Sequence, residues 1–215
     1  MINSTSTDNG VATLPRGERR KQHTKRRLLD AAAVTYALFG VDGATISAIT
    51  ETADVGLGTF YLHFEDKDAI AIAVAAVMVN RILADEQRAI DEVRSVGGSP
   101  DPLGVLSHAV CQRAAESPGL LAALLRWQGS KSASQIGALP GTIQHALLPH
   151  MADLYRTGVG SGRYRIEDPE LMAQAVFGVY CEVIPTWAHG LVGGDVAVEK
   201  LAAFVQRIVT AMCRA

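Results

Sequence analysis

The sequence predicts an all-α protein, with an N-terminal three-helix helix-turn-helix domain followed by a larger helical domain. Apolar residues recur at helical spacing along most of the chain, and none of its stretches is convincing as a strand. Asp101, Ser117 and Asp168 each precede a proline, which is a typical start signal for a helix. With 215 residues, 48% of them hydrophobic, the chain can bury a substantial core in one or two domains.

The chain begins with a basic extension, residues 1–21, that we expect to be disordered. A formal net charge of −2 argues against indiscriminate coating of nucleic acid, so any DNA binding must rest on a local basic patch. Residues 16–27 supply one, with seven arginines and lysines against the single acid Glu18. The alternative interpretation of this patch is a solvated tail with no binding role.

The first helix is predicted over residues 24–39, where apolar residues form a stripe of period 3.6. Gly40 is expected to end it, because glycine readily takes the left-handed conformation that follows many helices. A short turn then leads into the next segment. These features predict the first part of a compact helical unit.

Residues 45–64 are predicted to form a helix-turn-helix. Thr45 is a suitable N-cap for a short helix, and Asp54 and the two residues after it form the turn. The second helix, residues 57–63, is too short to be stable alone, so the apolar side chains of Phe60 and Phe64 must anchor it. Its remaining face is small, polar and aromatic, which suits a groove.

A long helix is predicted to begin after the N-cap Asp66 and to continue towards residue 93, linking the two domains. Lys67 then lies beside the positive end of the helix dipole, which is unfavourable for a cation. A bound phosphate would reverse this, because the helix terminus and Lys67 would hold the same anion. Lys67 is therefore predicted to contact a DNA phosphate.

The C-terminal helices are predicted over residues 102–116, 119–128 and 142–157, followed by two strongly apolar helices beginning near residues 169 and 200. The apolar stripe of the first of these two is too wide for one-sided packing. Both helices could serve the core of one subunit or pair with a second copy of the chain.

The N-terminal region resembles the tetracycline-repressor (TetR) family of bacterial transcription regulators over about residues 22–82. The most diagnostic part is the run V-x-x-G-T-F-Y-x-H-F-x-D-K at residues 55–67. Three residues depart from the common pattern: Thr50 replaces Ala, Asp54 replaces the turn Gly, and Gly56 replaces the capping Ser or Thr. Asp can adopt the left-handed conformation, and Gly is a tolerable N-cap.

This resemblance implies a DNA-binding domain at residues 22–82 and an effector-binding and dimerisation domain at residues 83–215. By carry-over from the family, DNA contacts are expected from Thr45, Leu57, Gly58, Thr59, Tyr61, His63 and Lys67. The basic Arg19 and Arg20 are expected to enter a minor groove or to grip phosphate.

The resemblance also implies a pocket for a small, largely apolar effector with one polar handle, and a dimer seam made by the last two helices. The candidate pocket residues are Trp127, His145, Met151, Tyr180, Glu182, Trp187 and His189. The candidate seam residues are Val176, Val179, Val183, Phe204, Val205, Ile208 and Met212. A two-fold dimer would present two recognition helices to a palindromic operator.

The sequence thus predicts a ligand-responsive transcription regulator, more commonly a repressor than an activator in this family. One alternative is a helical ligand-binding protein or enzyme whose N-terminal hairpin is only scaffold. Another is a dimeric DNA-binding protein whose second domain is collapsed and binds no effector.

We expect no catalytic site, cofactor or metal. His145 and His150 lack the HExxH arrangement of a zinc site, and the glycines at 158, 160 and 162 do not follow a strand. Cys111, Cys181 and Cys213 are expected to be core thiols of a cytoplasmic protein. The start of the chain does not resemble a secretory signal, and the longest apolar run, residues 69–79, is far shorter than the roughly 20 residues that span a bilayer.

Overall fold

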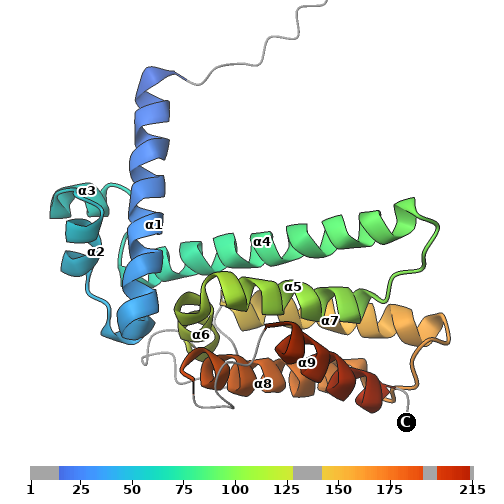
Figure 1. Ribbon diagram of the computed structural model, residues 1–215. Helices are drawn as coiled ribbons and strands as arrows, with labels where there is room; N and C mark the ends of the chain where they lie inside the picture. Colours follow the sequence, from blue (N-terminus) through green and yellow to red (C-terminus); the bar gives the residue numbers. More distant parts are fainter. Residues whose placement is uncertain (1–14, 128–141, 191–197, 214–215) are drawn as a thin grey trace, which may run out of the picture.

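The computed structural model describes residues 15–127, 142–190 and 198–213, but not the side chains of residues 198, 199 and 212. Throughout these ranges the regular structure is α-helical, which confirms the predicted all-α fold. Helix α1 stands beside the small helices α2 and α3, while the longer α4, α5, α7, α8 and α9 form a layered body (Figure 1). The predicted extension 1–14 lies outside the described residues.

Helix α1 spans Arg16–Gly43 and begins well before the predicted residue 24. The basic segment 16–21 is therefore helical and not a disordered extension, because its arginines and lysine are good helix formers and Pro15 immediately precedes the helix. Gly40 interrupts the regular helix with φ 71° and turns the chain towards α2. A positive φ strains residues that carry a Cβ, so glycine suits this position.

The helix-turn-helix consists of α2, Ile46–Thr52, and α3, Leu57–Tyr61. Thr45 caps α2 as predicted, since its Oγ1 accepts a hydrogen bond of 3.1 Å from the Ala48 N–H. Asp54 takes φ 49° in the turn, which confirms that an aspartate can replace glycine there. Phe60 is fully buried and joins α3 to the core of the domain.

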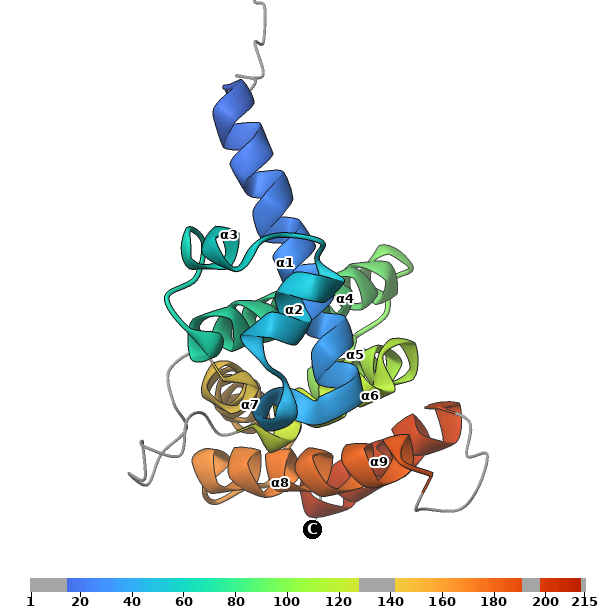
Figure 2. The same cartoon turned by 90° about the vertical axis from the view of Figure 1, so that its left-hand side faces the viewer.

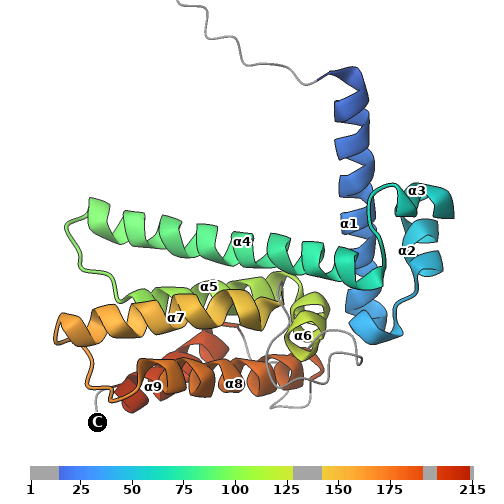
Figure 3. The same cartoon turned by 180° about the vertical axis from the view of Figure 1, so that it is seen from behind.

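Helix α4 spans Lys67–Ser95 and crosses the predicted domain boundary at residue 82 without a break. Its N-cap Asp66 accepts a hydrogen bond of 2.7 Å from the Ala69 N–H, as the sequence predicts. Figure 3 shows α4 lying over α5, Pro102–Glu116, and α7, Ile143–Gly160. The short α6, Pro118–Arg126, packs against α1 and thereby joins the two domains.

Helix α8, Pro169–Ala188, packs against α6 and α7, and α9, Val198–Cys213, packs against α5. Within the described part of the chain, α8 is the helix that is long and apolar enough to cross a membrane, with a mean hydropathy of 1.2. Core helices of globular proteins pass the same test. Packing against α6 and α7 buries only part of α8, since 33% of this apolar window is buried.

Candidate functional site

The outward face of α3 is exposed and carries large side chains. Leu57 and Tyr61 are 53% and 55% exposed, while Phe60 between them is fully buried. A Cβ added to Gly58 would meet nothing within 4 Å, so the backbone is open to an approaching partner there. Figure 2 looks onto α2 and α3, which lie on one side of α1 and away from α8 and α9.

The turn between α2 and α3 is held by Arg27 of α1. Its guanidinium donates hydrogen bonds to the carbonyl oxygens of Ala53 at 2.7 Å and of Asp54 at 3.0 Å, and it lies 3.3 Å from the Asp54 carboxylate. The arginine therefore caps the end of α2 and neutralises the acidic residue of the turn. One member of the basic patch has a structural role.

Replacing Arg27 with alanine is expected to lower the free energy of unfolding by about 1–2 kcal/mol, because two backbone carbonyls lose a charged donor at a half-exposed site. Chemical denaturation measures the change. Arg26→Ala is the matched control, since the Arg26–Asp30 pair is 3.8 Å long and exposed on both sides. An equal loss in the two variants would contradict the role assigned to Arg27.

The ammonium group of Lys67 also binds backbone carbonyls. It donates hydrogen bonds to Asp42 at 2.8 Å and Ala44 at 3.1 Å, and so ties the start of α4 to the turn before α2. An ammonium group has three donors, so one N–H is left for a phosphate. The predicted phosphate contact of Lys67 would thus add to a structural role that the sequence did not reveal.

A cleft of about 420 Å³ separates the first turns of α1 from α3. Its lining combines basic side chains with hydroxyl groups and contains no carboxylate; the residues are Gly17, Arg20, Lys21, Thr24, Thr59, Leu62 and His63. Partial burial, Lys21 and Lys25 together lower the pKa of His63 below its usual value. The cleft therefore has a positive potential that a phosphate would offset.

The structure brings three predicted DNA-binding residues, Arg20, Thr59 and His63, to this one cleft. Sequence reasoning missed Lys21, which lines the cleft, and Lys25, which lies over the Phe64 ring at 5.7 Å from its centroid. The available signal was the i, i+4 spacing of these two lysines, which places them on one helix face. That signal applies only if the helix extends through the basic segment.

The predicted pocket residues do not share one cavity. Met151 and Tyr180 are buried in the interior, whereas His145 is exposed on α7. Trp127 and His189 line a cavity of about 380 Å³ between the end of α1 and α6. Glu182 and Trp187 instead line a groove between α8 and α9.

The groove between α8 and α9 has a volume of about 460 Å³ and a mostly apolar lining: Glu182, Val183, Thr186, Trp187, Lys200, Leu201 and Phe204. Of the predicted seam residues, Val183 and Phe204 lie here, and Val179 and Ile208 are half-buried elsewhere on the two helices. The assignment of Val176 and Val205 to the seam is wrong, because both are fully covered within one subunit and belong to its core. The Met212 side chain lies outside the described residues.

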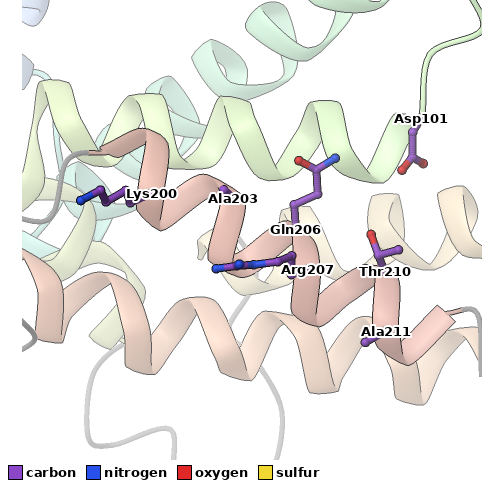
Figure 4. Close-up of a pocket in the computed structure, with 7 residues that line it drawn as sticks. All are labelled: Asp101, Lys200, Ala203, Gln206, Arg207, Thr210 and Ala211. Carbon is purple, nitrogen blue, oxygen red and sulfur yellow. The ribbon is translucent and has the colours of Figure 1, made fainter.

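A second hollow, of about 920 Å³, runs along α9 and reaches Asp101 at the start of α5 (Figure 4). Lys200, Gln206 and Arg207 supply its polar side chains from α9, between the small residues Ala203, Thr210 and Ala211. Helix α9 thus lines an almost wholly apolar groove beside α8 and a hollow of mixed polarity that extends to α5.

Among the described residues, the three cysteines form no disulfide. Burial raises the pKa of Cys111 to about 12 and that of Cys181 to about 11, so both stay protonated and unreactive near neutral pH. Within the described ranges, no group of three or more His, Cys, Asp or Glu side chains could hold a metal ion.

Comparison with known proteins shows a family match in the N-terminal region. Residues 28–74 match the sequence model described as bacterial regulatory proteins, tetR family. Over 79 residues the chain is 30% identical to an HTH-type transcriptional repressor of Mycobacterium tuberculosis. This match spans 36% of the chain and 42% of the length of that repressor.

Two solved structures resemble the chain over most of its length. The fatty acid degradation regulator FadR from Bacillus halodurans superposes with a TM-score of 0.70 at 21% identity, over 87% of this chain and 94% of that one. FadR from Bacillus subtilis, in complex with stearoyl-CoA, gives 0.66 at 21% identity, over 88% and 99%. At such identities the likeness concerns the fold.

These findings define the class: an all-α helix-turn-helix protein that shares its fold with solved transcriptional regulators. The N-terminal part of the chain, residues 28–74, carries the sequence pattern of the tetR family of bacterial regulatory proteins.

Proposed function

We propose that the protein is a homodimeric repressor that binds a palindromic operator and releases it when a small, largely apolar effector binds. The main support is the exposed face of α3 beside a basic cleft whose lining contains no carboxylate. Phosphate contacts position such a helix on the duplex, while side chains at base edges or the shape of the groove give specificity. Leu57 and Tyr61 are the large side chains available for these contacts.

Dimerisation through α8 and α9 is supported by the apolar groove between them. Phe204 remains 45% exposed and Trp187 half-buried in the isolated subunit, so a second copy would cover apolar surface that water now reaches. A two-fold axis along these helices would pair two α3 helices with the two half-sites of one operator.

Fluorescence anisotropy with DNA from immediately upstream of the protein's own gene, at two salt concentrations, tests the regulator. We expect saturable binding that resists competitor DNA, falls steeply with salt and weakens in Tyr61→Phe, which removes one exposed hydroxyl. The ring of Tyr61 stays against Phe60, so this variant should fold normally. If random-sequence selection also finds no DNA ligand, the scaffold alternative replaces this proposal.

The same assay should show proton uptake at His63. Lys21 and Lys25 help to keep its pKa low in the free protein, and a phosphate in the cleft would counteract them, so the pKa should be higher in the complex. The added affinity is complete below the free-state pKa and is lost as the pH rises through the bound-state pKa. Operator affinity should therefore increase as the pH falls through the bound-state pKa of His63 towards its free-state pKa, which lies below the usual value.

His63→Gln is the control for this pH dependence, because glutamine keeps polar hydrogen-bonding groups but does not titrate. It should flatten the affinity profile at constant ionic strength. A profile of unchanged slope in this variant would show that another group takes up the proton.

Release by an effector is supported by the fold, which the Bacillus subtilis regulator shares and in which that protein binds stearoyl-CoA. In the proposed mechanism the effector changes the spacing of the two recognition helices. Linkage requires that effector and DNA weaken each other's binding by the same factor. We further propose that the protein works in the cytoplasm, where it meets both partners.

A further inference from the structure

Glu86 is a buried carboxylate with a free acceptor. It lies in the middle of α4, and only 4% of its surface is exposed. Its Oε2 accepts a hydrogen bond of 2.8 Å from His150 of α7, while Oε1 has no hydrogen-bond partner among the described residues. Leaving a charged oxygen buried and unpaired is costly, so such an atom calls for a functional explanation.

The carboxylate belongs to a polar cluster inside the C-terminal domain. The hydroxyl of Tyr180 on α8 is buried 2.7 Å from that of Ser107 on α5. Burial raises the pKa of Tyr180 above its usual value. Helix α4 packs against α5 and α7, and α8 packs against the same two helices. Helices α4, α5, α7 and α8 therefore each contribute a polar group to this cluster.

The surroundings of the cluster are apolar. Ile82 lies one turn before Glu86, Leu147 one turn before His150, and Phe177 one turn before Tyr180, and all three are almost completely buried. A site of this composition holds an apolar molecule by burial and fixes its orientation through a few polar contacts.

We propose that this cluster is the polar end of the effector site and that Glu86 Oε1 accepts a hydrogen bond from an alcohol, phenol or ammonium group of the effector. A carboxylate can only accept, so an effector bearing a carboxylate in that position would be repelled. The proposal rests on the regulator function above and adds the chemical class of its ligand.

The position of Glu86 also explains how such a ligand would affect the DNA-binding domain. Glu86 is on the same uninterrupted helix as Lys67, 19 residues away, or about 28 Å at the usual helical rise. Lys67 is bound to the carbonyls before α2. A ligand bound at Oε1 that displaced α4 would therefore move the helix-turn-helix through Lys67.

Three probes that share a naphthalene body test the site: naphthalen-2-ylmethanol, naphthalen-2-ylmethanamine and 2-naphthoate. Thermal unfolding of the full chain without DNA is the readout. We expect the alcohol or the amine to raise Tm by roughly 5 °C at concentrations well above Kd, and the carboxylate to give no shift. Glu86→Gln should abolish the shift by the amine, whereas Glu92→Gln, at an exposed site on the same helix, should preserve it.

The proposal is overturned if neither the alcohol nor the amine stabilises the protein, or if 2-naphthoate stabilises it equally. It is also overturned if the amine still raises Tm in Glu86→Gln. Should that variant fail to fold, Glu86→Asp is the alternative, because aspartate keeps the charge but its shorter side chain moves the oxygen away from the ligand. Glu86→Asp should weaken probe binding about tenfold, a loss typical of one charge-assisted hydrogen bond. Operator release is measured separately. Probe binding without any DNA binding would sink the regulator function and leave the ligand site standing.

Discussion

Phe60→Ala is expected to lower the free energy of unfolding by about 3–5 kcal/mol and to abolish operator binding. The Phe60 ring is fully buried, with its centroid 5.4 Å from that of Tyr61 and 5.8 Å from that of Phe64. Helix α3 has five residues and cannot persist without tertiary packing. Removing its anchor should release the recognition surface, as chemical denaturation and anisotropy would show together.

Leu62→Ala provides the comparison for this effect, because Leu62 follows α3 and is 77% exposed. Its free energy of unfolding should change by no more than about 0.5 kcal/mol. Comparable losses in the two variants would mean that α3 is held by something other than the buried ring of Phe60.

The double variant Arg20→Gln, Lys21→Gln should weaken operator binding roughly 10- to 100-fold at low salt, since two cations leave the cleft beside α3. Each lost phosphate contact reduces the slope of log affinity against log salt by about 0.9. The slope should therefore fall by roughly 1.8 in this variant. Because both side chains are exposed, the stability of the protein should remain the same.

A charge change far from the cleft shows whether operator affinity depends on contacts in the cleft or on the net charge of the protein. Arg94→Gln alters the last turn of α4, at the opposite end of that helix from the helix-turn-helix (Figure 1). Its salt slope should match that of the unchanged protein. If Arg94→Gln and the double variant lowered the affinity in proportion to their charge, the cleft would have no special role.

Features set by neighbouring residues could be predicted from the sequence. Thr45, Asp66 and Asp168 were predicted to begin helices, and each accepts the expected hydrogen bond from an N–H three residues later. Asp101 and Ser117 also precede helices as predicted, but neither side chain accepts a capping hydrogen bond. The start of α1 carries no such side-chain cap, and its position was accordingly predicted too late.

Features set by contacts between distant segments could not be predicted. The partner of Glu86 is 64 residues away on α7, and a carboxylate within a helical pattern is ordinarily expected to face solvent. The stripe of α8 is apolar on too many sides to show which residues face its own core, so Val176 was assigned to the seam although it is buried within the subunit. Helical periodicity identifies an apolar face but not the neighbour that covers it.

The contact between α1 and α6 limits how this protein could exchange parts with its relatives. A Cβ on Gly119 of α6 would lie 2.7 Å from the carbonyl oxygen of Ala37, so the two backbones almost touch. A chimera joined within α4 would take α1 from one parent and α6 from the other. Such hybrids should fold only when the parent that supplies α6 has glycine at the position of Gly119. This one residue therefore decides whether the operator recognition of one parent can be combined with the effector response of the other.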